Sequence, residues 1–162
     1  MKENIIGREQ EIEKLENYIS SRKSEFIAIY GRRRIGKTFL VKELFENRFA
    51  FRVTGKDNVT TKEQLTSFSF ALNDQLGIET DVTNWPEAFR LLQKALEKMT
   101  DGTKIIFFDE LPWFDTYASN FISALEHFWN DWAFYRSDIK LIACGSATTW
   151  MLNQVINSRG GL

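Results

Sequence analysis

The residues of this chain that are best suited to chemistry form a glycine-rich loop that ends in a lysine and a threonine. Residues 31–38 read Gly-Arg-Arg-Arg-Ile-Gly-Lys-Thr, which matches the pattern G-x-x-x-x-G-K-[ST] in full. The glycines allow the backbone to curl so that successive N–H groups face one anion, and a helix that starts in the loop adds partial positive charge. The loop therefore predicts a binding site for the phosphates of ATP with Mg²⁺.

Individual residues of the loop have distinct expected roles. Lys37, a predicted catalytic residue, should reach the β- and γ-phosphates, and the Thr38 hydroxyl should ligate Mg²⁺. The alternative is an arbitrary glycine turn, but an apolar run at 26–30 precedes the loop and an amphipathic helical pattern at 39–45 follows it, in the order that a phosphate-binding loop requires. The other members of the expected ATP-binding set are Gly31, Arg32, Arg33, Arg34, Ile35, Gly36 and Phe39.

Two adjacent carboxylates, Asp109 and Glu110, end the apolar run at 105–108. Ligands of open α/β sheets bind at the carboxyl ends of the strands, so this pair is expected on the same side as the phosphates. Asp109 is the predicted second Mg²⁺ ligand, and Glu110 is the predicted base that orients and deprotonates an attacking water. Taken alone, the pair would also fit an acidic turn before Pro112.

A further polar residue, Ser146, follows the apolar run at 139–144. A hydroxyl at that strand tip is able to contact the γ-phosphate or the attacking water, so Ser146 joins the predicted catalytic residues. A second description also fits, in which Ser146, Thr148 and Thr149 cap a helix that runs to residue 156.

Four short apolar runs alternate with helical patterns along the chain. Each run is apolar on both faces, as strands of a buried parallel sheet are, and they lie at 26–30, 49–53, 105–108 and 139–144. Helical periodicity appears at 12–19 and 121–132, Thr60 with Glu63 forms a capping box, and Asn84 is expected to cap a further helix. We expect a three-layer α/β/α domain of the P-loop NTPase class, with a parallel sheet covered on both sides.

The charges of the chain nearly cancel, with 21 basic and 22 acidic residues. No overall field would hold nucleic acid or an anionic membrane, so a DNA partner has no support from charge, although a local basic patch is compatible with these counts. Cys144 is the only cysteine, which excludes an intramolecular disulfide and favours a reducing compartment, by default the cytoplasm. The sequence predicts neither a secretory signal nor a membrane span.

Other interpretations of the polar residues fit less well. The N-K-x-D segment of a GTPase is absent, and a nucleotide kinase would usually lack Glu110 and carry an arginine-rich lid.

The arginines at 32–34 are expected to flank the triphosphate rather than to contact DNA. His127 has no histidine or cysteine at metal-ligand spacing, so no metal site is predicted there. The aromatic pair at 113–114 is expected to pack beneath the site, with a partner surface as the alternative.

Further motifs read Ile-Gly-Arg-Glu-Gln-Glu at 6–11, Phe-Phe-Asp-Glu-Leu-Pro-Trp at 107–113 and Cys-Gly-Ser-Ala-Thr at 144–148. Together with the loop at 31–38, they resemble the AAA+-related ATPases of archaea and bacteria, close to the STAND signalling ATPases. In such proteins a Gly-Arg-Glu segment lies near the adenine, so the resemblance implies that Gly7 and Arg8, with the apolar Ile5 and Ile6, line a base pocket. A solvated position in the first helical turn is the alternative for Arg8. The resemblance covers the chain end to end.

The resemblance also implies parts that are not found in these 162 residues. Family members have a fifth strand beside the phosphate-loop strand, a helical or winged-helix lid with a sensing arginine, and often an effector domain. Residues 1–162 are therefore expected to form a P-loop ATPase domain that is incomplete at its C-terminal end. The open edge of the strand at 26–30 would invite pairing with another chain, and nucleotide binding and turnover would be weak. Arg136 and Arg159 are the two candidates for an arginine finger toward a neighbouring subunit, and Arg159 is preferred because it follows the helix after the fourth strand, where AAA+-like relatives place theirs.

Two functions are consistent with these residues. The first is an ATPase, in which Lys37, Thr38 and the Asp109-Glu110 pair drive hydrolysis and further domains use the energy for a conformational change. The second is a nucleotide-gated switch, which holds ATP or ADP while an effector domain, a partner protein or a second copy reads the bound state. A DNA-tethering module is a third alternative. No feature of the sequence selects a downstream target.

Overall fold

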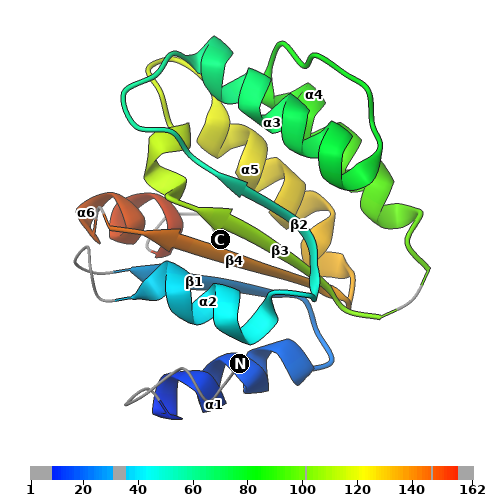
Figure 1. The fold of residues 1–162 in the computed structure, drawn as a ribbon, viewed down its shortest axis with the longest axis vertical. Coiled ribbons are helices and arrows are strands. Elements are labelled where there is room, and N and C mark those ends of the chain that lie inside the picture. Colours follow the sequence, from blue (N-terminus) through cyan, green and yellow to red (C-terminus); the bar gives the residue numbers. More distant parts are fainter. Residues whose placement is uncertain (1–8, 31–35, 101, 147, 157–162) are drawn as a thin grey trace.

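Four parallel strands form the centre of the molecule (Figure 1). The computed structural model describes residues 9–30, 36–100, 102–146 and 148–156. The strands lie in the order β1-β4-β3-β2, so β1 and β2 follow one another in the chain but are separated in the sheet by β4 and β3. All four apolar runs expected to be strands are confirmed as β1 (Glu25–Tyr30), β2 (Phe49–Thr54), β3 (Lys104–Asp109) and β4 (Ile139–Gly145).

Helices connect the strands and begin where the capping signals predict. The Thr60 hydroxyl accepts the N–H of Glu63 at 3.1 Å, and Asn84 Oδ1 accepts the N–H of Glu87 at 2.8 Å. In the described part of the chain, no helix is long and apolar enough to cross a membrane. The helices are α1 (Glu9–Ser20), α2 (Lys37–Phe45), α3 (Thr61–Leu76), α4 (Trp85–Glu97), α5 (Phe121–Asp131), α6 (Thr148–Met151), the 3₁₀-helices η2 (Leu111–Phe114) and η3 (Ala133–Tyr135), and the π-helix η4 (Leu152–Ile156).

The sheet is covered on both faces, which confirms the expected α/β/α layering. Helices α1 and α2 lie on one face, and α3, α4 and α5 lie on the other (Figure 1). Side chains alternate along each strand, so Ile105 and Phe107 of β3 join the core under α1 and α2, whereas Ile106 and Phe108 join the core under α3 to α5. By the same alternation, Asp109 follows the side chains that face α2.

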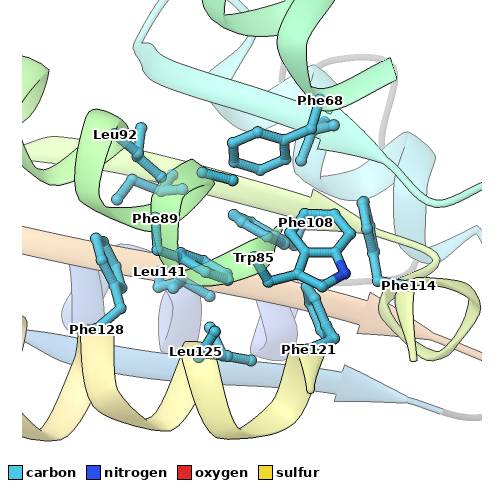
Figure 2. Packing of buried hydrophobic residues seen from close by; sticks show 14 of the residues in the cluster. Phe68, Trp85, Phe89, Leu92, Phe108, Phe114, Phe121, Leu125, Phe128 and Leu141 are labelled. Atoms are coloured by element: carbon cyan, nitrogen blue, oxygen red, sulfur yellow. The ribbon is translucent and has the colours of Figure 1, made fainter. Parts of the chain in front are cut away.

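The larger core is built mainly from aromatic rings. Figure 2 shows several of them gathered around the buried indole of Trp85 on α4. The Trp85 and Phe121 ring centroids are 4.9 Å apart in an edge-to-face pair, and the Phe114 and Phe121 rings are stacked at 5.2 Å. Phe114 of η2 also lies 5.6 Å from Phe108 of β3. This aromatic network therefore fixes η2, the segment that directly follows Asp109 and Glu110, to the core.

The two edges of the sheet differ in how their backbone is paired. At the β2 edge, the side chain of Gln75 on α3 pairs with the backbone of Arg52. Gln75 Oε1 accepts the N–H of Arg52 at 2.9 Å, and Gln75 Nε2 donates to the Arg52 carbonyl at 2.7 Å. In the described part of the chain, β1 pairs with β4 and has no strand on its other side. A cavity of about 540 Å³ lies beside β1, and its lining includes α1.

A charge cluster closes the opposite, amino-terminal end of the sheet. Asp138, just before β4, accepts Lys104 Nζ of β3 at 2.8 Å and two nitrogens of Arg136 at 2.9 and 2.8 Å. The hydrogen bonds from Arg136 are the main reason that the pKa of Asp138 falls from 3.8 to about 2, and Lys104 contributes in the same direction. Burial of the carboxylate opposes this shift. Asp138 therefore neutralises a lysine side chain that is only 5% exposed.

We predict that Asp138→Asn lowers the stability of the domain at neutral pH and abolishes part of its acid sensitivity. A carboxyl whose pKa is lower in the folded state stabilises the fold above its ordinary pKa, and this contribution is lost as pH falls toward the folded value. The free energy of unfolding should fall by about 1 kcal/mol at pH 7, a figure reduced for partial solvent screening. Urea titrations should show the gap to wild type narrowing as pH falls from 3.8 to about 2. A gap that stays constant over that range would contradict the assignment.

Candidate functional site

The hydroxyl of Thr38 and the carboxylate of Asp109 are in direct contact at the carboxyl edge of the sheet. Thr38 Oγ1 lies 2.9 Å from Asp109 Oδ1 and 3.0 Å from Oδ2, although the residues are 71 positions apart in sequence. Asp109 is 5% exposed and ends β3, while Thr38 lies in the first turn of α2. The structure therefore brings together the two residues that were predicted to ligate Mg²⁺.

The start of α2 has the backbone that a phosphate-binding turn requires. Gly36 is the N-cap of α2 and has φ 77°, a left-handed conformation that side-chain-bearing residues adopt at a cost. Its carbonyl accepts the N–H of Leu40 at 2.9 Å, which closes the first helical turn. Lys37 follows directly and is 7% exposed. Phe39, in contrast, is half exposed on the surface of α2.

Glu110 adopts a strained backbone conformation between β3 and η2. Its φ of 52° and ψ of 47° are left-handed, which costs a residue other than glycine about 1–2 kcal/mol. The Glu110 N–H donates to Asp109 Oδ1 at 3.0 Å, and its carbonyl accepts the N–H of Trp113 at 3.1 Å. The backbone of Glu110 is therefore held by contacts on both sides, and its predicted role as the base stays a prediction.

A neighbouring glycine allows this conformation. Gly55 follows β2, and its N–H donates to the Asp109 carbonyl at 2.9 Å. A Cβ atom at position 55 would lie 2.5 Å from the carbonyl oxygen of Glu110, closer than such atoms approach in folded proteins. Gly55 is therefore needed for close approach of two backbones and not for a positive φ.

The segment after β4 is fixed against η2. A Cβ atom at Gly145 would lie 2.7 Å from Pro112, so the end of β4 packs against η2 without room for a side chain. Trp150 Nε1 of α6 donates to Asp115 Oδ2 at 2.9 Å. Ser146, which is predicted to contact the γ-phosphate or the attacking water, lies directly after β4 at the same edge of the sheet and is partly buried. Its predicted contact with phosphate stays a prediction.

Several predicted residues lie elsewhere or outside the described chain. Arg136 is hydrogen-bonded to Asp138 at the amino-terminal end of the strands, far along the sheet from Asp109. His127 contacts Asp131 at 2.6 Å on the solvent-exposed face of α5, and the described residues contain no group of three metal-binding side chains. Phe114 is fully buried, which confirms the expected packing, and Trp113 is partly buried. Residues outside the described part of the chain are Gly7, Arg8, Gly31, Arg32, Arg33, Arg34, Ile35 and Arg159.

Sequence reasoning missed one buried polar residue beside the site. Gln64 is fully buried and hydrogen-bonds to Lys56 and Trp113. A signal was present, because Gln64 lies four positions before Phe68 and therefore on the buried stripe of α3. A polar residue on such a stripe is expected to have specific hydrogen-bond partners.

The charges of the site act on Cys144, which lies on the Asp109 side of β4. Burial raises the pKa of the Cys144 thiol, Asp109 and Glu110 raise it further, and Lys37 opposes them. The thiol is 1% exposed. Both effects keep it protonated and inaccessible in the folded protein.

We predict that Cys144 reacts with a disulfide reagent only when the domain opens. The labelling rate of the native protein at mildly alkaline pH should be at least about 10³-fold below that in concentrated guanidinium chloride, because folded proteins rarely sample the open state. Absorbance of the released thiol measures both rates, and the chain offers no other cysteine to confuse the signal. Rapid labelling of the native protein would mean that β4 is not packed as described.

Comparisons with known proteins agree with this geometry. Residues 5–160 match the family of ATPase domains found predominantly in Archaea. An uncharacterised protein of Methanocaldococcus jannaschii is 31% identical over 161 residues, which are 98% of this chain and 33% of that protein. An ATP-binding protein of the same organism is 44% identical over 44 residues, which are 27% of this chain and 75% of that protein. The chain thus spans about a third of the length of the first of these relatives.

Solved structures share the fold at low identity. The Walker-type ATPase of Pyrococcus abyssi has a TM-score of 0.63 and 20% identity, and the match covers 95% of this chain and 49% of that protein. Cdc6p of Pyrobaculum aerophilum has a TM-score of 0.63 and 18% identity, with coverages of 91% and 41%. Drosophila ORC bound to DNA has a TM-score of 0.59 and 14% identity, with coverages of 89% and 78%. The chain therefore belongs to the family of ATPase domains found predominantly in Archaea and has the α/β fold of AAA+-like P-loop ATPases.

Proposed function

We propose that this domain binds ATP with Mg²⁺ at the carboxyl edge of β1, β3 and β4 and hydrolyses it. The contact between the Thr38 hydroxyl and the Asp109 carboxylate is the observation that carries the proposal. A threonine that follows the phosphate-loop lysine and an aspartate that ends a central strand meet there, although no local sequence constraint joins them. Phosphate-loop ATPases use this pair of residue types to hold the metal of their substrate.

The donor atoms at this contact fit Mg²⁺. Mg²⁺ is a hard cation that takes oxygen ligands and retains several waters, so a hydroxyl and one carboxylate are a sufficient protein contribution. Thr38 and Asp109 would hold the ion through the oxygens that now face one another. When bound, the ion would neutralise negative charge on the phosphate oxygens.

The remaining residues of the site have separate proposed tasks. Lys37 binds the β- and γ-phosphates and stabilises the negative charge there. Glu110 orients the attacking water and accepts its proton, while Ser146 contacts the γ-phosphate or that water. Gly7 and Arg8 remain the proposed adenine neighbours, and the backbone of residues 31–36 remains the proposed phosphate cradle.

A second candidate is a nucleotide-gated switch with little turnover. Its support is that the segment after Glu110 is tied to α6 through Asp115 and Trp150, so a change at the carboxylates has a direct route to the end of the described chain. Coupling to a conformational change in further domains is proposed on the same basis, and on the chain covering 33% of a longer relative. A DNA partner is a third alternative, motivated by ORC having been solved on DNA and opposed by a net charge of −1.

We predict that Lys37→Ala weakens ATP binding by at least about 10-fold, because it removes the cationic side chain expected at the β- and γ-phosphates. Titration calorimetry in the presence of Mg²⁺ measures the affinity. Lys42→Ala is the matched control, since Lys42 lies on the same helix but is exposed. Equal ATP affinity of wild type and Lys37→Ala would contradict the phosphate-site assignment.

We predict that Glu110→Gln lowers ATP turnover by about 10²-fold or more while leaving ATP affinity within a few-fold of wild type. The amide keeps the size of the side chain but cannot accept a proton from water. Asp109→Ala should in addition abolish the Mg²⁺ dependence of binding. Glu46→Gln, an exposed position after α2, should leave turnover unchanged. Tight ATP binding with the same slow turnover in wild type and Glu110→Gln would support the switch instead.

A further inference from the structure

The amide of Gln64 joins the two loops that surround Asp109 and Glu110. Its Nε2 donates to the carbonyl of Lys56 at 2.6 Å and to the carbonyl of Trp113 at 2.9 Å, and its Oε1 accepts the N–H of Lys56 at 3.1 Å. The side chain is fully buried. All the hydrogen-bonding groups of the amide therefore have partners in the loop after β2 or in η2.

Both loops contact the backbone of Glu110. Trp113 bonds to Gln64 through its carbonyl and to the Glu110 carbonyl through its N–H, the latter at 3.1 Å. Lys56 follows Gly55, whose Cα packs directly against the same Glu110 carbonyl. A short path of hydrogen bonds thus runs from the buried amide of α3 to the one backbone conformation of the site that is strained.

The strained conformation decides where the Glu110 carboxylate points. A left-handed backbone at a glutamate persists only when surrounding contacts hold it. A base must lie within hydrogen-bond reach of the water it deprotonates, and a displacement of about 1 Å costs on the order of 10²-fold in rate. The hydroxyls of Thr61 and Thr116 form a second contact between α3 and the same segment, further from Glu110.

We propose that Gln64 is a positioning residue, which holds the backbone of Glu110 in the left-handed conformation that aims its carboxylate. This inference rests on the proposed function of Glu110 as the base. The competing view is that Gln64 only satisfies buried backbone groups and stabilises the fold.

The same helix provides a matched control. Gln75 makes the same two-way contact with the backbone of Arg52 that Gln64 makes with Lys56, but it lies at the β2 edge, away from Glu110. Loss of the Gln75 amide removes the same pair of backbone hydrogen bonds at an exposed position, without touching the path to Glu110. An effect of releasing α3 from the β2 segment would therefore appear in both variants, and a positioning effect only at Gln64.

The test compares Gln64→Met with Gln75→Met in the folded protein. Gln64→Met should lower kcat by at least about 10-fold and leave ATP affinity within about 2-fold, because Lys37, Thr38 and Asp109 are unmoved. NMR should show faster hydrogen exchange of the Trp113 amide, which bonds to Glu110. Gln75→Met should change neither kcat nor the exchange rate of the Trp113 amide. In a Glu110→Gln background, Gln64→Met should cause no further loss of turnover, since there is no base left to position.

The outcomes separate this inference from the proposed function. If Glu110→Gln retains wild-type turnover, the proposed base is wrong and the inference falls with it. If Glu110→Gln is impaired but Gln64→Met has wild-type kcat and Trp113 exchange, only the inference is overturned. An additional loss in the double variant would assign Gln64 a general structural role. Gln64→Asn serves as a second variant if Gln64→Met does not fold, because it keeps a neutral amide in the buried site but is one methylene too short to make all three hydrogen bonds.

Discussion

The order of the strands in the sheet is what brings Thr38 and Asp109 into contact. β1 and β3 are both neighbours of β4, so the helix that follows β1 begins close to the end of β3. All strands are parallel, which places their carboxyl ends at one edge, and the alternation of side chains turns Asp109 toward α2. A shift of one residue in the register of β3 would turn the carboxylate to the opposite face and abolish the contact.

The second constraint is the fixed position of the segment after Glu110. Phe114 is inserted among the aromatic rings of the larger core, Trp150 bonds to Asp115, and Gln64 bonds to Trp113. Contacts from three elements therefore meet on a few residues next to a strained backbone. Such convergence is how proteins keep costly conformations at functional sites, because several surrounding contacts together determine one backbone conformation.

Much of this arrangement was predictable from local signals. Buried parallel strands read as continuous apolar runs, and all four were found at the expected positions. The Thr60 and Asn84 caps are local interactions between residues three apart, so the sequence contains both partners of each. The phosphate loop and the Asp-Glu pair were likewise recognisable, because their chemistry requires specific residue types at fixed spacing.

By itself, then, the sequence determined the elements, the layer arrangement and the residue types at the strand ends, because short-range periodicity and spacing encode them. Only the tertiary structure decided which strands are neighbours, that Thr38 reaches Asp109, and that Glu110 is left-handed. It alone distinguishes Gln64 from Gln75, two glutamines on one helix with the same backbone-pairing chemistry. Their partners are set by long-range packing, in which the position of each amide depends on loops that no local sequence pattern specifies.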